Sequence, residues 1–204
     1  NYATLQPRFQ AMENLQITFL GTGTSHGIPV IGCECAVCKS SDPRDKRLRT
    51  AIHIKMPSMS IAVDTTPDFR TQCLREDITR LDAVIYTHSH VDHILGFDDL
   101  RRFCELENKA IPVHGSHETL TSLKRVFQYA FDGSARYPNY VRPDPVTMSG
   151  KFAMDGFDII PVDLPHGRMV TNGLVFEKNG RRLFAYFTDC QSVPPEAEEA
   201  ARGV

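Results

Sequence analysis

Short apolar runs separated by turn-forming residues give the predicted organisation of the chain. Eight runs have the length and composition of strands: residues 15–20, 50–55, 60–64, 81–86, 111–113, 157–162, 174–177 and 183–188. Three stretches have helical capping or spacing signals: residues 67–76, 96–107 and 116–131. Segments 21–42 and 132–145 are rich in turn-forming residues and are predicted loops. Strand pairs with interspersed helices predict a layered α/β protein.

Length and charge narrow the class of protein. With 204 residues, the chain can bury a sizeable core, and we expect one domain over residues 12–204. Residues 1–11 have the character of a tag or a disordered N-terminus, with Met12 as a natural start. The formal net charge of −2 provides no basic field for nucleic acid or anionic lipid, so an anionic substrate must be held by local features.

The location predicted from the sequence is cytoplasmic. No apolar run approaches the roughly 20 residues of a membrane span, and the N-terminus lacks the apolar core of a signal peptide. The six cysteines are crowded into one loop or scattered singly, a placement that does not indicate disulfides.

The segment THSHVDH carries the strongest chemical signal. It follows the strand at residues 81–86 and contains His88, His90, Asp92 and His93. Imidazole and carboxylate groups suit zinc and neighbouring divalent metals. Alternation along an extended segment points His88 and His90 the same way, and a turn then presents Asp92 and His93 to a second position. A solvated polar loop is the alternative explanation.

A second group of metal-binding residues lies in the cysteine-rich loop. Cys33, Cys35 and Cys38 form a C-x-C-x2-C arrangement. Three thiolates at this spacing can bind one zinc ion with a fourth ligand from elsewhere. The alternative is a set of reduced loop cysteines without a metal.

The pattern H-x-H-x-D-H after a hydrophobic strand resembles the metallo-β-lactamase superfamily. The resemblance implies a four-layer αββα sandwich. It also implies further ligands from a later His, an Asp and a final His, and the first two match His166 in LPHG and Asp189 in FTDC. Taken singly, His166 could be a loop histidine and Asp189 a helix cap. The final His would lie beyond Val204, so the resemblance implies that the C-terminal part is missing.

The opening GTGTSHGIPVIGCECAVC, residues 21–38, is similar to the phosphonate-pathway phosphodiesterases that hydrolyse phosphoribosyl cyclic phosphate. The resemblance implies a structural zinc on the cysteine loop, whose fourth ligand would also lie beyond Val204. His26 in the glycine loop either contacts a substrate phosphate, as a catalytic residue, or caps the turn. Homodimers are common among the similar enzymes, although no residue here requires one.

The function implied is hydrolysis of a small, cyclic phosphodiester by a hydroxide that two Zn or Mn ions activate. One metal would be held by His88, His90 and His166, and the other by Asp92 and His93. Asp189 would bind both metals, and Asp64 would orient ligand imidazoles. Asp92 and Asp189 would thereby take part in catalysis. Two alternatives remain: a tRNA 3′-processing nuclease, against which the low basic charge counts, and a non-catalytic metal or cofactor carrier. All three functions require these side chains to converge on one pocket.

Overall fold

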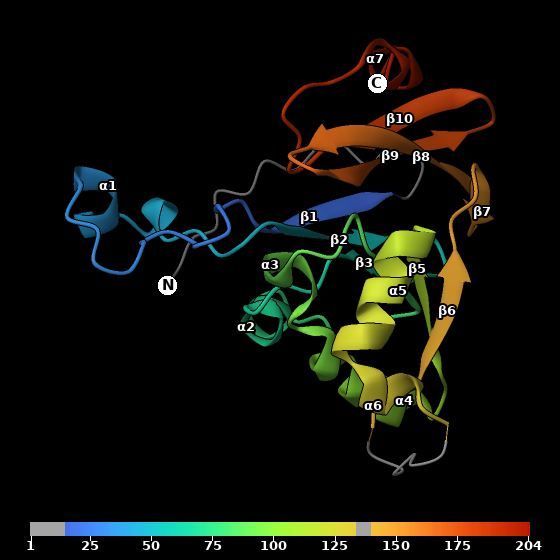
Figure 1. Ribbon diagram of the computed structural model, residues 1–204, viewed down its shortest axis with the longest axis horizontal. Helices are drawn as coiled ribbons and strands as arrows, with labels where there is room; N and C mark the ends of the chain where they lie inside the picture. The colour runs from blue at the N-terminus through green and yellow to red at the C-terminus, as the bar shows by residue number, and fades with distance from the viewer. Residues whose placement is uncertain (1–14, 134–139) are drawn as a thin grey trace.

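Two β-sheets lie face to face in the computed structural model, which describes residues 15–133 and 140–204 (Figure 1). Within these residues the larger sheet has six strands in the order β1-β2-β3-β4-β5-β6. Strands β1 to β3 are antiparallel, whereas β3 to β6 are parallel neighbours. The strands are β1 (Gln16–Gly21), β2 (Ala51–Lys55), β3 (Ser60–Val63), β4 (Ala83–Ile85), β5 (Ile111–Gly115) and β6 (Pro143–Thr147).

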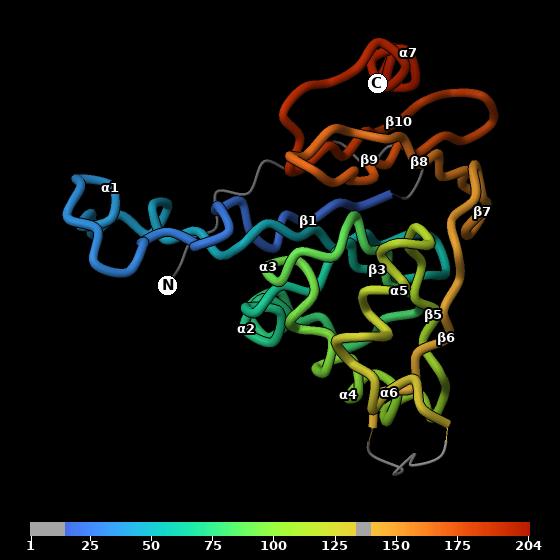
Figure 2. The backbone as a smooth tube through the Cα atoms, in the orientation of Figure 1, coloured from blue at the N-terminus to red at the C-terminus, as the bar shows by residue number. Residues whose placement is uncertain are grey.

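The smaller sheet is antiparallel, with the order β10-β9-β8-β7 in the described part of the chain. Its strands are β7 (Phe152–Met154), β8 (Phe157–His166), β9 (Met169–Lys178) and β10 (Arg181–Tyr186). Strands β8 and β9 form a long hairpin whose last pair is His166 with Met169. Figure 2 shows this hairpin lying across the larger sheet.

Helices cover the outer faces of both sheets (Figure 1). The larger sheet is covered by α2 (Phe69–Arg75), α3 (Val91–Ile94), the 3-10 turn η2 (Phe97–Asp99), α4 (Leu100–Glu107), α5 (His117–Val126) and α6 (Gln128–Phe131). Helix α7 (Pro195–Ala200) packs beside β8 on the smaller sheet. The predicted αββα sandwich is therefore confirmed. None of the described helices has the length and apolar character needed to cross a membrane.

A projecting arm carries the remaining two elements, α1 (Ala36–Lys39) and the 3-10 turn η1 (Pro43–Asp45) (Figures 1 and 2). The arm connects β1 to β2. It is bound at its base, where the side chain of Arg47 donates to the Thr22 carbonyl and that of Arg49 to the Ser25 carbonyl.

Alternation along the strands divides the core into two layers. In β2, Ile52 and Ile54 point between the sheets, where they meet Phe157 and Phe176 of the smaller sheet. Ala51 points the other way, into the layer beneath the helices. Both faces of the larger sheet are thus buried, which explains why its central strands are apolar runs instead of alternating ones.

The predicted helix over residues 116–131 is interrupted. Phe127 separates α5 from α6 and has φ −110° and ψ 41°, outside the helical region. Its ring stacks on Phe97, with 4.5 Å between ring centroids. Burial of this aromatic pair outweighs the helical preference of the local sequence, a tertiary effect that spacing alone cannot reveal.

The predicted loop over residues 132–145 ends in a strand. Residues 134–139 lie outside the described residues, but Pro143 begins β6 at the edge of the larger sheet. The Arg142 carbonyl faces β5, since it accepts from Ile111 N, so Pro143 and Pro145 face away from the sheet. Prolines are tolerated at such an edge because no ladder partner needs their missing N–H.

The same arrangement recurs in β8. The Pro165 carbonyl accepts from Gln191 N, outside the ladder with β9, so Pro165 faces the outer edge. Pro161, four residues earlier, faces the same edge. Strands β8 and β9 are also longer than predicted, because two prolines and a polar face obscure their strand pattern.

His53 gives the fold a testable pH dependence. Burial, with a further contribution from Lys55, lowers the pKa of His53 to about 4, and its ring contacts Ser60 Oγ at 2.7 Å. The unfolded chain, with a pKa near 6.5, binds the proton first. The free energy of unfolding should therefore fall as the pH drops from about 6.5 to 4. Urea titrations should show that the free energy of unfolding falls less steeply with pH for His53→Gln than for the wild type over this range. Equal pH dependence in the two proteins would contradict the role of His53.

Candidate metal centre

Strand β4 carries the histidine segment into the interior. The strand ends at Ile85, and residues 86–90 lead to α3, where His90 is the N-terminal cap and has an extended backbone. Thr87 and His88 are fully buried, and His93 in α3 is 1% exposed. The short helix places Asp92 and His93 beside the first two histidines, and the ring centroids of His93 and His88 lie 4.2 Å apart.

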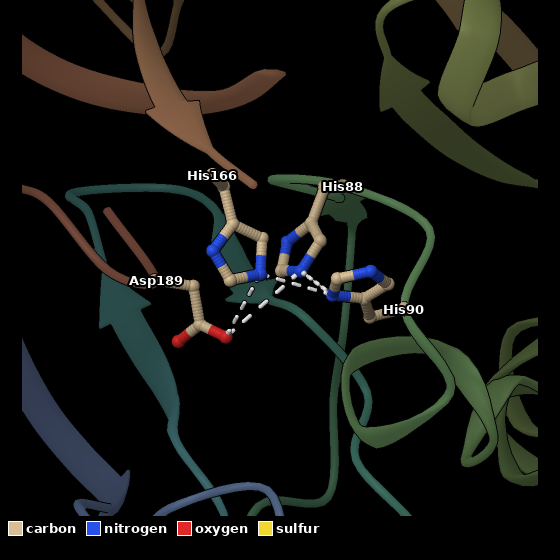
Figure 3. A group of neighbouring side chains, drawn as sticks. All are labelled: His88, His90, His166 and Asp189. Atoms are coloured by element: carbon tan, nitrogen blue, oxygen red, sulfur yellow. Dashed lines mark hydrogen bonds and ion pairs between the residues drawn. The ribbon is translucent and has the colours of Figure 1, made fainter. Parts of the chain in front are cut away.

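Four side chains form the first group, and Figure 3 shows them turned toward one another. They are His88, His90, His166 and Asp189. His90 Nδ1 lies 3.0 Å from His88 Nε2 and 3.1 Å from His166 Nε2. Asp189 Oδ2 lies 4.0 Å from His88 Nε2 and 3.9 Å from His166 Nε2. The structure therefore brings together residues separated by up to about half of the chain.

A second group adjoins the first and consists of Asp92, His93 and Asp189. His93 Nε2 lies 3.2 Å from Asp189 Oδ2 and 3.4 Å from Asp92 Oδ2. Asp189 is thus a member of both groups, and its Oδ2 atom faces the histidines of each. It occupies the place that a shared ligand of two adjacent cations would need.

Two loops bring His166 and Asp189 to this position. His166 ends β8, and the tight turn of Gly167 and Arg168 returns the chain to β9. Gln191 joins the two loops, because its N–H donates to the Pro165 carbonyl and its side chain accepts from Gly167 N. Gln191 was not predicted from the sequence, because its only local signal is its position two residues after Asp189.

Asp189 itself has a left-handed backbone, with φ 51°. Asparagine and aspartate tolerate this conformation better than most residues. Thr188 Oγ1 donates to Asp189 Oδ1 at 3.0 Å, while Oδ2 faces the histidines. One oxygen is therefore fixed by the protein and the other is available to the cluster.

The donor set fits a divalent metal ion. Zinc binds imidazole nitrogen at about 2.0–2.1 Å, so two ligands of a tetrahedral ion lie roughly 3.3 Å apart. The four spacings of 3.0 to 4.0 Å given above for the first group bracket that value. Nitrogen with carboxylate oxygen suits zinc or manganese.

Electrostatics in the cluster favour a positive charge. Burial, followed by the nearby His93, lowers the pKa of His88 to about 4, so its ring is neutral at pH 7. Burial also opposes charge on His93, but Asp64 and Asp189 outweigh it and raise the pKa of His93 to about 12. The hydrogen bond to His93 holds the pKa of Asp189 well below its usual range. A divalent cation bound among these carboxylates would supply the positive charge that the extra proton on His93 otherwise supplies.

Asp64 contacts the imidazole of His93 from behind. It is fully buried, at the end of β3, and its Oδ2 lies 2.8 Å from His93 Nδ1. The same oxygen accepts from Thr87 Oγ1 at 2.8 Å. An orienting role for Asp64 was predicted from the sequence, whereas Thr87, which lies within the histidine motif, was not recognised there.

The three cysteines of the arm also come together. The sulfur atoms of Cys33, Cys35 and Cys38 lie within 4.8 Å of one another. The Val30 N–H points at Cys38 Sγ and the Cys38 N–H at Cys35 Sγ, and this second contact lowers the pKa of the Cys35 thiol. Among the described residues no fourth His, Cys, Asp or Glu joins them at that spacing. Zinc binding here stays a prediction.

His26 is not a member of either histidine group. It occupies an exposed turn after β1, where Gly27 N donates to the Thr24 carbonyl. Within residues 15–133 and 140–204, no hydrogen bond or ion pair links His26 to the histidine cluster. Its proposed contact with substrate phosphate remains a prediction.

Comparisons with known proteins agree with this geometry. A solved diphosphatase from the PhnP family superposes with a TM-score of 0.82 and 38% identity, covering 93% of this chain and 72% of that one. Zinc-bound PqqB from Methylobacterium extorquens superposes with a TM-score of 0.70 at 19% identity, covering 90% and 68%. The latter likeness concerns the fold alone.

The sequence comparisons place the chain in a family. It is 34% identical over 196 residues to an octanoyltransferase of Porphyromonas gingivalis, covering 92% of this chain but only 37% of that relative. The chain thus spans little more than a third of that protein. The family model for the beta-lactamase superfamily domain matches residues 60–204, well over half of the sequence. The chain therefore belongs to the beta-lactamase superfamily and has the metallo-β-lactamase fold.

Proposed function

We propose that this chain hydrolyses a small phosphodiester, preferentially a cyclic one, with two divalent cations, Zn or Mn. The observation that carries the proposal is the pair of adjacent ligand groups that meet at Asp189 Oδ2. His88, His90 and His166 would hold one cation, and Asp92 with His93 the other. Bound cations would supply a water of near-neutral pKa and neutralise charge on the phosphoryl oxygens.

The protein's own residues supply the orientation that this chemistry needs. The buried Asp64 and Thr87 fix the rings of His93 and His88. The Thr188 hydroxyl fixes one oxygen of Asp189, so the other faces the space between the two groups. Such support behind the ligands keeps the site in one geometry as charge develops on the substrate.

The choice of a phosphodiester rests on two similarities. The opening segment resembles cyclic phosphodiesterases, and the PhnP-family diphosphatase shares 38% identity over nearly the whole chain. Because the net charge is −2, an anionic substrate gains no attraction from the molecule as a whole. We infer that cations in the cluster provide it.

The test is turnover by the full chain after metal removal and metal return. Dialysis against a chelator should abolish hydrolysis of bis(p-nitrophenyl) phosphate and of a cyclic phosphodiester, and Mn²⁺ or Zn²⁺ should restore it. A β-lactam and a thioester serve as comparison substrates. Preference for either of these would contradict the substrate class, and metal binding without any turnover would favour a carrier.

His90→Ala should lower the rate at least about 100-fold, because even partners behind metal ligands contribute 10–100-fold. The matched control is His117→Ala, which removes an exposed histidine at the start of α5. We expect the control to retain the rate within about twofold. Equal rates for the two variants would contradict the role of the cluster.

A further inference from the structure

The hydroxyl of Thr87 lies between a buried carboxylate and an imidazole of the metal centre. Thr87 is fully buried, and its Oγ1 is 2.8 Å from Asp64 Oδ2 and 3.0 Å from His88 Nδ1. Its backbone N–H also donates to Asp64 Oδ1, at 2.9 Å. Both contacts with Asp64 fix the position of the Thr87 side chain.

The directions of these hydrogen bonds follow from the chemistry of the groups. An ionised carboxylate can only accept, so the single proton of the Thr87 hydroxyl points to Asp64. The hydroxyl oxygen can then only accept from His88, whose Nδ1 must carry the proton. A neutral imidazole has one N–H, which leaves Nε2 of His88 with a free lone pair. That atom faces His90 Nδ1 at 3.0 Å.

The same carboxylate acts on the second group. Asp64 Oδ2 lies 2.8 Å from His93 Nδ1, so the proton on His93 Nδ1 leaves Nε2 to face Asp92 and Asp189. One buried oxygen therefore governs a histidine in each group, directly for His93 and through a hydroxyl for His88. The effect on His88 therefore depends on a second side chain, that of Thr87, whereas the effect on His93 does not.

We propose that Thr87 is a positioning residue of the metal centre, whose hydroxyl passes the orienting effect of Asp64 to His88 and fixes the tautomer that binds a cation through Nε2. The inference rests on the proposed cation binding but not on the phosphodiester substrate. Metal affinity and tautomer state can be measured without substrate. Failure of the hydrolysis assay would therefore leave this inference testable on its own.

The test compares Thr87→Val, which keeps the shape without the hydroxyl, with Thr87→Ser, which keeps the hydroxyl without the methyl group. Competition with a chromophoric chelator should show Zn²⁺ affinity 10–100-fold lower for Thr87→Val, the range measured for partners of metal ligands. Thr87→Ser should remain within about threefold of the wild type. Equal losses in both variants would assign the effect to packing, and no loss in Thr87→Val would overturn the proposal.

A second measurement does not depend on whether the valine variant folds. In the wild-type protein after chelation, ¹⁵N imidazole spectra should show His88 with its proton on Nδ1. Observation of the Nε2-protonated tautomer would overturn the proposal directly. In Thr87→Val, if folded, the two tautomers of His88 should become mixed while His93 keeps its Nδ1 proton.

Discussion

Asp189→Ala is expected to reduce phosphodiester hydrolysis by roughly 1,000-fold or more, the largest effect on activity of any single substitution considered. Its Oδ2 atom belongs to both ligand groups, 3.2 Å from His93 Nε2 and 3.9–4.0 Å from two histidines of the first group. One substitution therefore damages both cation positions. Loss of a single electrostatic partner in an active site commonly costs 10²–10³ in rate, so loss of a shared one should equal or exceed the upper value.

The measurement pairs steady-state rates with metal content per chain. We expect Asp189→Ala to hold fewer metal ions than His90→Ala, because His90 contacts only the first group. Asp163→Ala is the matched control, since Asp163 is an exposed aspartate on β8 that binds Asn172. A variant of Asp189 that kept its metal and more than a tenth of the wild-type rate would refute the shared position.

Gly96→Ala should lower the free energy of unfolding by roughly 3 kcal/mol, the upper end for an overpacked interior position. A Cβ at this residue would lie 2.3 Å from the Thr66 carbonyl oxygen and 2.6 Å from Phe69 Cβ. Neither neighbour is the flexible end of a side chain. Relief requires the backbone after α3 to move.

That movement would reach the metal centre. Helix α3 is held by two backbone hydrogen bonds, from Thr65 N to the His93 carbonyl and from Gly96 N to the Thr65 carbonyl. We therefore expect Gly96→Ala to weaken metal binding as well as folding. Gly133→Ala is the control, because among the described residues no atom beyond its chain neighbours lies within 4 Å of its added Cβ. Urea titrations that gave the two variants equal stability would contradict this explanation.

The histidine segment could be predicted from the sequence because its information is local. A buried strand ended by His88, His90, Asp92 and His93 fixes two directions of side chains within six residues. His166 and Asp189 were found through the resemblance alone, since neither has a distinctive neighbour. Their convergence depends on the length of β8 and on a two-residue turn, which the prolines of that strand concealed.

Features that depend on tertiary packing could not be predicted. Phe127 interrupts a helical pattern to stack on Phe97, thirty residues earlier in the chain. The role of Thr87 follows from a hydroxyl held between β3 and β4, and threonine after a strand carries no such signal by itself. The cysteine loop was found from its spacing, but the spacing could not show that it lies on an arm away from the sheets.

The prolines at the two sheet edges bear on how these molecules behave at high concentration. Pro143 and Pro145 leave the rim of β6 without two of its outward donors, and Pro161 and Pro165 do the same along the part of β8 that extends beyond β7. A strand from another molecule would find few N–H groups at either rim, and on β8 the Pro165 carbonyl is already bonded to Gln191 N, so neither rim can template a continuous intermolecular ladder. These borders thereby resist edge-to-edge aggregation while the apolar strands behind them stay covered.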